Sequence, residues 1–243
     1  MNVAEFHKNG QHIRYDSDIF NDLEDVSFNS RVWAQRSSIV GFAEGRGTTF
    51  FIQHQNQDFV LRHYQRGGLV ARMSKEKYLW LGLRFTRPWR EWVLLENMLI
   101  KGLPVPMPAA VKVKRKGLLY TADIMMHRIP NAKTLMHILM LEEVGEEHWI
   151  TVGSTIRHFH EEGVYHADLN ANNILLDEGG HCFLIDFDRC NIRKPKLKWQ
   201  KENLARLKRS LNKISKNEDV FHFSDVNWRS LLRGYGWNDK NEI

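Results

Sequence analysis

Three acidic or amide side chains stand close together in one short stretch of the chain. Asp168 lies in a polar turn, Asn173 closes that turn, and Asp186 follows a second apolar run. The two apolar runs, 174–176 and 182–185, are joined by a turn that contains glycine, and this pattern predicts a β-hairpin. Asn173 and Asp186 would then lie at neighbouring strand ends, with Asp168 on the loop that leads into the first strand.

These are the side-chain types that phosphoryl transfer needs. One carboxylate accepts the proton of the acceptor hydroxyl, while a carboxylate and an amide oxygen bind the Mg²⁺ ions that bridge nucleotide phosphates. The spacing from Asp168 to Asn173 matches the kinase catalytic loop H-x-D-x-x-x-x-N, and residues 186–188 stand where D-F-G would. A solvated Asn/Asp-rich turn is the alternative for either half alone. Both halves, in order and suitably spaced, favour a kinase-like phosphotransferase that uses ATP and Mg²⁺.

Length, composition and charge narrow the class of protein. The chain has 243 residues, of which 42% are apolar, enough for one bilobal unit or two small domains. Two cysteines are too few for a disulfide framework and fit a reducing compartment. We expect neither a signal peptide nor a transmembrane span, because no run of about twenty apolar residues occurs. A net charge of +6 favours an anionic partner: nucleic acid, an acidic membrane surface or a phosphorylated substrate.

Glycines near the start of a predicted N-terminal hairpin are candidates for holding the nucleotide phosphates. Strand-like runs over residues 48–52 and 58–64 flank a polar turn, and Gly45 and Gly47 lie just before the first run. Glycine lets backbone amides approach a phosphate closely, as in the glycine-rich loop of kinases. The fit to G-x-G-x-x-G is partial, so an ordinary glycine turn stays the alternative.

The same half of the chain offers a cation and a carboxylate for a nucleotide site. Arg62 stands where V-A-I-K has its lysine, although a guanidinium is bulkier than an ammonium group. A helix is predicted over residues 88–101, and we place Glu91 in its first turn as the partner of Arg62. A favourable charge at the helix N-terminus is the alternative role for Glu91. Other residues that stay open for these two roles are His63, Arg66, Lys75 and Glu96.

The chain past Asp188 is strongly basic. An apolar stripe predicts one long helix that begins near Trp199, with basic residues over much of the remaining surface. The stripe consists of Leu204, Leu207, Leu211 and Ile214. In part this is a solvated helix packed on the rest of the protein. A lopsided charge of this size near the candidate site also favours an anionic acceptor or anionic lipid headgroups.

The catalytic loop and the metal-binding turn resemble the protein-kinase-like superfamily over about residues 40–190. This resemblance implies an α+β fold of the bilobal protein-kinase-like type. Its N-lobe would be a small antiparallel β-sheet with one helix, and its C-lobe would be mainly helical. We therefore expect a polar, irregular N-terminal extension over residues 1–30, an N-lobe over 31–127 and a C-lobe over 128–243, within a single kinase-like domain.

Three departures argue against a conventional protein kinase. Ala167 replaces the usual arginine of the catalytic loop, and Asn170 stands where Ser/Thr kinases carry a phosphate-contacting lysine. The segment between Asp186 and Trp199 is short and has no A-P-E sequence, so it offers no long activation segment to bind a peptide. A small hydroxyl compound or a sugar is therefore the expected acceptor.

A closer resemblance extends over nearly the whole chain. Its motifs are similar to those of the 3-deoxy-D-manno-octulosonic acid (Kdo) kinases of Gram-negative lipopolysaccharide assembly. They begin at Phe59 (FVLRHY, then RGG), Gly102 (GLPVP), Phe159 (FHEEGVYHADLN) and Trp199 (WQKENLARLKRSL).

That resemblance implies ATP-dependent phosphorylation of the 4-hydroxyl of Kdo on a lipid A precursor. Asp168 would act on the hydroxyl, and Asp186 and Asn173 would hold Mg²⁺. The reaction would take place at the cytoplasmic face of the inner membrane. Because the acceptor is an anionic glycolipid, the basic C-terminal region would contact the acceptor or the membrane surface peripherally, and no nucleic acid is expected as a partner.

Other functions stay open at this point. A heptose kinase of the lipopolysaccharide core shares the chemistry and differs in its acceptor. A RIO-like atypical protein kinase would phosphorylate serine, but the short segment after Asp186 disfavours it. A pseudokinase that binds nucleic acid would use the basic region alone, and the intact set of Asp168, Asn173 and Asp186 argues against it.

Overall fold

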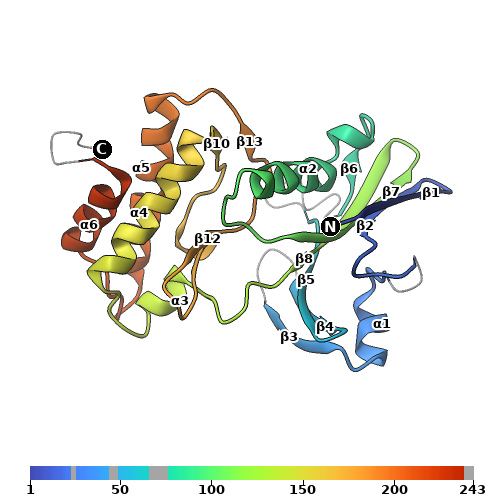
Figure 1. The fold of residues 1–243 in the computed structure, drawn as a ribbon, viewed down its shortest axis with the longest axis horizontal. Helices are drawn as coiled ribbons and strands as arrows, with labels where there is room; N and C mark the ends of the chain where they lie inside the picture. The colour runs from blue at the N-terminus through green and yellow to red at the C-terminus, as the bar shows by residue number, and fades with distance from the viewer. Residues whose placement is uncertain (23–25, 44–48, 66–75, 238–243) are drawn as a thin grey trace. The chain divides into compact units, whose positions relative to one another are not determined.

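The chain divides into two compact units. The structure is a computed structural model that describes residues 1–22, 26–43, 49–65 and 76–237. Unit 1 consists of Met1–Glu96 and Pro106–Arg128, and unit 2 consists of Asn97–Val105 and Ile129–Ile243 (Figure 1). The chain passes between the units after Glu96, after Val105 and after Arg128, so Asn97–Val105 groups with the later half of the chain.

Unit 1 is built on one antiparallel sheet, whose described part has eight strands. Its strands are β1 (Val3–Lys8), β2 (Gln11–Asp16), β3 (Ile39–Ala43), β4 (Thr49–His54), β5 (Gln57–His63), β6 (Tyr78–Leu79), β7 (Pro108–Lys116) and β8 (Leu119–His127). They lie in the order β1-β2-β7-β8-β5-β4-β3, with β6 paired to β8. The predicted hairpin of β4 and β5 is confirmed, and its two turn residues, Gln55 and Asn56, have φ angles of 48° and 60°. Such left-handed pairs suit the tight turns that match strand twist.

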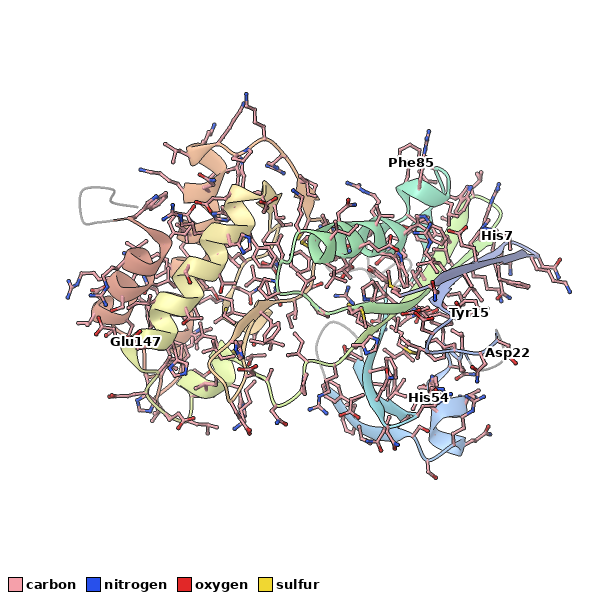
Figure 2. All side chains as sticks on the ribbon, viewed as in Figure 1. His7, Tyr15, Asp22, His54, Phe85 and Glu147 are labelled. Atoms are coloured by element: carbon pink, nitrogen blue, oxygen red, sulfur yellow. The ribbon has the colours of Figure 1, made fainter. Side chains whose placement is uncertain are left out.

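The N-terminal residues are part of this sheet. The prediction of an irregular extension over residues 1–30 is wrong for residues 3–16, because β1 and β2 form a hairpin and β2 pairs with β7. Asn9 and Gly10 make the turn with φ angles of 51° and 73°, and Asn-Gly is a strong hairpin signal. Figure 2 shows His7 on β1 and Tyr15 on β2. The sequence pattern did not predict this hairpin because β1 buries no side chain and has only Ala4 and Phe6 half-buried, so its apolar alternation is short and weak.

In the described part of unit 1, two α-helices and a short 3₁₀ turn accompany the sheet. They are α1 (Ser30–Gln35), η2 (Leu83–Phe85) and α2 (Arg87–Ile100), whose last residues group with unit 2. The sequence predicted α2 and missed α1. The side chain of Asn29 caps α1 by accepting a hydrogen bond from the backbone N–H of Arg31, and Trp33 of α1 is fully buried. Trp33 packs in a core with Phe20, Ile52 and Phe59, which explains why so short a helix forms.

Unit 2 is mainly helical. Its elements are β9 (Lys133–Thr134), α3 (Leu135–Leu139), α4 (Glu146–Glu161), β10 (Val164–Tyr165), η3 (Ala171–Asn173), β11 (Ile174–Leu176), β12 (Cys182–Leu184), β13 (Asn191–Ile192), α5 (Leu197–Asn217) and α6 (Asp225–Tyr235). Figure 2 marks Glu147 at the N-terminal end of α4. The predicted stripe of α5 is confirmed for Leu204, Leu207 and Leu211, which are fully buried, whereas its last residue, Ile214, is half-buried. Together, the antiparallel sheet and these helices confirm the predicted α+β class.

Glycines let α4 and α6 pack at very close range. A Cβ built on Gly153 of α4 would overlap the backbone carbonyl of Leu231, and one on Gly234 of α6 would overlap that of Ile150. Figure 1 shows the two helices side by side. Neither position therefore accepts a larger side chain without movement of backbone.

Among the residues that the structure describes, no helix combines the length and apolar character that crossing a membrane requires. Both cysteines, Cys182 and Cys190, are free and buried.

Candidate active site

The hairpin of β11 and β12 brings Asn173 and Asp186 together as predicted. The strands pair with Ile174 opposite Leu184, and the backbone N–H of Ile185 donates to the carbonyl of Asn173 at 3.0 Å. Asn173 therefore lies beside Ile185 at the open end of the hairpin, and Asp186 is the next residue along the chain. The two predicted metal ligands sit on neighbouring strand ends of one small sheet.

Side-chain amides fix the turn that carries Asp168. The backbone carbonyl of Asp168 accepts hydrogen bonds from Nδ2 of Asn170 at 2.9 Å and from Nδ2 of Asn173 at 2.8 Å. Oδ1 of Asn170 accepts from the backbone N–H of Asn172 at 2.8 Å and so caps η3. Asn173 is 8% exposed, and its NH₂ group points into the loop, which leaves its amide oxygen as the atom suited to a cation.

A buried histidine ties the Asp168 turn to the Asp186 strand. The ring of His166 lies 3.0 Å through Nε2 from the carbonyl of Ile185, and its Nδ1 accepts from the backbone N–H of Asp168 at 3.2 Å. These partners place the ring proton on Nε2. Burial lowers the pKa of His166, so the imidazole stays neutral at pH 7 and both hydrogen bonds persist.

Asp186 has an unusual backbone. Its φ angle is 63°, in the left-handed region that residues other than glycine seldom adopt. Such a conformation persists only where its surroundings impose it, and it is concentrated at functional sites. The Asp168 side chain, by contrast, is half-exposed and lies 3.6 Å through Oδ1 from Nη1 of Arg206 on α5. No sequence pattern predicts this last contact, because Arg206 is distant from Asp168 along the chain.

In unit 1, Arg62 and Glu91 form the predicted ion pair. Nη2 of Arg62 lies 2.7 Å from both carboxylate oxygens of Glu91, whose side chain is 1% exposed. Glu91 is the fifth residue of α2 rather than a first-turn residue, because the helix begins at Arg87. The buried hydroxyl of Tyr64 also donates to Glu91. Burial raises the pKa of Tyr64 well above its ordinary value, so this hydroxyl stays a donor.

Sequence reasoning did not single out Tyr64, although its place two residues after Arg62 puts both side chains on one face of the chain. The alternatives that the structure describes have other partners. Nδ1 of His63 lies 2.6 Å from Asp123, and this hydrogen bond raises the pKa of His63. Glu96 lies 3.4 Å from Arg14. The remaining candidates, Gly45, Gly47, Arg66 and Lys75, lie outside the described residues.

The donor set around the hairpin fits Mg²⁺ and does not suit a softer metal. A carboxylate and an amide oxygen are hard ligands, and Mg²⁺ in kinases is bound by one or two such groups together with substrate phosphates. Among the described residues, no group of three or more His, Cys, Asp and Glu side chains forms a metal cluster. Asp186 and Asn173 are compatible with a Mg²⁺ site that substrate phosphates complete.

Comparisons with known proteins agree over most of the chain. A 3-deoxy-D-manno-octulosonic acid kinase of Photobacterium profundum is 36% identical over 225 residues, which cover 93% of this chain and 94% of that one. The protein of the same name from Vibrio vulnificus is 39% identical over 223 residues, 92% of this chain and 94% of its own. The one from Haemophilus influenzae strain PittEE is 35% identical and covers 96% and 99%.

The solved structure of the Cydia pomonella granulovirus kinase PK-1 matches at 12% identity with a TM-score of 0.44. The match covers 67% of this chain and 56% of that one, and a likeness this weak supports no argument. The family described as "Lipopolysaccharide kinase (Kdo/WaaP) family" matches residues 30–235. With that match over most of its length, and with relatives at 35–39% identity along nearly all of it, the chain belongs to the lipopolysaccharide kinase (Kdo/WaaP) family.

Proposed function

We propose that this chain transfers the γ-phosphate of ATP to the 4-hydroxyl of Kdo on a lipid A precursor. Membership of a kinase family makes the chain a phosphotransferase. The observation that carries the choice of acceptor is that the relatives named as Kdo kinases match more than nine-tenths of both chains. A match of that extent includes the catalytic loop and the basic α5 together.

In this proposal Asp168 orients the acceptor hydroxyl and takes its proton. The half-exposed carboxylate is accessible to a substrate, while its backbone is held by Asn170, Asn173 and His166. A carboxylate held in this way acts as a general base without a further loss of conformational entropy during the reaction. The strained backbone of Asp186 supports a functional role for that residue as well.

The oxygen atoms of Asp186 and Asn173 would hold Mg²⁺, which when bound neutralises charge on the nucleotide phosphates. Arg62 would contact the α- and β-phosphates. Its guanidinium is oriented by the buried carboxylate of Glu91, and a guanidinium fork suits the geometry of phosphate oxygens. Backbone amides at Gly45 and Gly47 would contribute further phosphate contacts. We keep residues 31–127 and 128–243 as the proposed lobes of one kinase-like domain.

The exposed basic residues around α5 support an anionic glycolipid acceptor and peripheral contact with an anionic membrane. Cations along one helix attract anionic headgroups, and the strength of that attraction depends on salt. These residues include Arg193, Lys194, Lys196, Lys198, Lys201, Arg209, Lys213 and Lys216. Trp199 is buried against His160 and so is not available to a lipid interface. We place the reaction at the cytoplasmic side of the inner membrane.

Transfer of labelled γ-phosphate from ATP and Mg²⁺ tests the acceptor. The acceptors compared are a Kdo-bearing lipid A precursor, the same precursor without Kdo, a heptose-bearing core and a generic protein. Label on the Kdo-bearing precursor alone is expected. Label on the heptose-bearing core alone, or on the protein alone, would contradict the proposal in favour of a heptose kinase or a RIO-like protein kinase.

A further inference from the structure

The catalytic loop supplies no cation of its own. Between His166, which is neutral, and Asn173, the side chains are alanine, aspartate, leucine and asparagine. Asn170 stands at the position where Ser/Thr kinases carry a phosphate-contacting lysine. Its side-chain amide makes its hydrogen bonds inside the loop, with the backbone of Asp168 and of Asn172. Phosphoryl transfer spreads negative charge over the moving phosphoryl oxygens. A cation beside the base must therefore come from another element.

Helix α5 is anchored directly to the catalytic loop. Asn203 is 1% exposed, and its Oδ1 accepts a hydrogen bond from the backbone N–H of His166 at 3.1 Å. Arg206 lies three residues later on the same face of the helix, and its Nη1 lies 3.6 Å from Oδ1 of Asp168. The anchor and the arginine thus contact the loop two residues apart. The helix itself is fixed by the buried side chains of Trp199, Leu204, Leu207 and Leu211.

The stability of the fold does not explain the arginine at this place. The side chains of Arg206 and Asp168 are 44% and 50% exposed, and ion pairs that water screens to this extent contribute little to stability. A guanidinium carries five N–H donors in a planar fork. Contact through Nη1 with one carboxylate oxygen therefore leaves donors for a second anion beside Asp168.

We propose that Arg206 is a catalytic residue that contacts the transferring phosphoryl group and takes the part of the missing loop cation. The inference rests on the proposed role of Asp168 as the base. The acceptor oxygen is hydrogen-bonded to Asp168, so the phosphoryl group that it attacks approaches the same carboxylate and the guanidinium beside it.

In this step the acceptor oxygen forms its bond to the γ-phosphorus while the bond from that phosphorus to the β–γ bridging oxygen breaks. The bridging oxygen keeps the electron pair and leaves as part of ADP, and the hydroxyl proton passes to the Asp168 carboxylate. Arg206 donates hydrogen bonds to the phosphoryl oxygens and exchanges no proton. The positive charge of Arg206 stabilises the transition state most strongly, because the phosphoryl group then lies between the leaving oxygen of ADP and the acceptor oxygen that is losing its proton.

The test compares steady-state kinetics of Arg206→Gln and Arg206→Lys with those of Asp168→Asn and of the control Arg229→Gln. Arg229 is an exposed arginine on α6, so its replacement removes the same charge away from the loop. We expect Arg206→Gln to lower kcat by about 10²–10³-fold, as the loss of a transition-state hydrogen-bond donor does. We expect its KM for ATP and its thermal midpoint to stay close to the wild-type values, and Arg206→Lys to recover part of the rate.

Three results would overturn the inference. Near-normal kcat in Arg206→Gln, with Asp168→Asn inactive, would show that Asp168 is the base and that Arg206 takes no part. A loss in Arg206→Gln that the lysine does not relieve and that comes with a lowered thermal midpoint would assign Arg206 a structural role. An active Asp168→Asn variant would overturn the proposed role of Asp168 itself, and the inference with it.

Discussion

At the scale of single residues, buried side chains hold the polar groups for which we propose functional roles. His166 holds the backbone of Asp168 and the carbonyl of Ile185 with one neutral ring. In unit 1, the buried carboxylate of Glu91 receives hydrogen bonds from both Arg62 and Tyr64. Both arrangements fix the geometry of a polar group before any substrate binds, and this preorganisation is what phosphoryl transfer requires of a protein.

Glu91→Gln tests the arrangement in unit 1. The amide lacks the charge that orients Arg62, so we expect the KM for ATP to rise and the free energy of unfolding to fall by about 1.5–3 kcal/mol, the range for hydrogen bonds to charged groups. Urea denaturation and ATP-dependent kinetics measure the two effects. Glu96→Gln is the matched control, because its pair with Arg14 at 3.4 Å is more exposed and is worth about 1 kcal/mol or less. Equal effects of both variants would contradict a special role for Glu91.

At the scale of elements, α5 and the close pair of α4 and α6 position the loop. Asn203 of α5 accepts from the backbone of His166 and also lies 3.4 Å from Nε2 of His160 on α4. His160 in turn lies 2.8 Å through Nδ1 from the hydroxyl of Tyr235 on α6. The loop that carries Asp168 is thus connected to three helices through one chain of buried polar side chains.

Gly153→Ala tests the packing of α4 on α6. The added methyl group meets the backbone of Leu231, which cannot rotate away, so we expect the free energy of unfolding to fall by about 1–3 kcal/mol despite the better helix propensity of alanine. Gly145→Ala is the control: its Cβ would lie 3.7 Å from the nearest atom, a ring nitrogen of His148. Chemical denaturation compares the two variants. A Gly153→Ala protein as stable as the wild type would show that the helices are not held at this distance.

The buried chain also predicts a pH dependence of stability. Burial lowers the pKa of His160 to about 4 from its ordinary value of 6.5, so the folded state favours the neutral ring. The contribution of the neutral His160 ring to the free energy of unfolding is complete above pH 6.5. It is lost as the pH falls toward 4, and the loss amounts to about 3 kcal/mol over that interval. Burial shifts the pKa of His166 in the same direction.

Urea denaturation at several pH values between 7 and 4 measures this loss. His160→Gln should be less stable at pH 7 and should lose less stability on acidification than the wild type does. His158→Gln, an exposed histidine of the same helix, is the control and should follow the wild-type curve. If the stability of His160→Gln fell with pH in parallel with that of the wild type, His160 would not be the group that takes up a proton on unfolding.

At the scale of the whole molecule, local patterns were predictable and contacts between distant segments were not. The hairpins of β4 with β5 and of β11 with β12 follow from apolar runs around turns, and α2, α4 and α5 follow from helical spacing. The ion pair of Arg62 and Glu91 was predictable because a kinase pattern named both positions. The N-terminal hairpin has an Asn-Gly turn, but its edge strand β1 buries no side chain, so the apolar alternation that marks a strand is weak there.

The contacts of α5 with the loop show why the other tertiary contacts could not be predicted from the sequence. Nothing in the spacing of Asn203 and Arg206 names His166 or Asp168 as their partners, since the helix and the loop meet only through tertiary packing. The short helix α1 likewise has too little periodicity of its own and forms because Trp33 completes a core. In the sequence, the glycines of α4 and α6 have no evident role. The structure shows that each lies against the backbone of the other helix, where a Cβ atom does not fit.

The most direct test of the central claim is the rate of a single turnover with Mg²⁺, ATP and the Kdo-bearing lipid A precursor, compared between the wild type and Asp168→Asn. Asparagine preserves the shape of the side chain and removes the base. We predict a rate about 10²–10⁴-fold lower, with the affinity for a non-hydrolysable ATP analogue unchanged. A wild-type rate in Asp168→Asn would contradict it, because phosphoryl transfer would then proceed without the carboxylate on which the proposed mechanism depends.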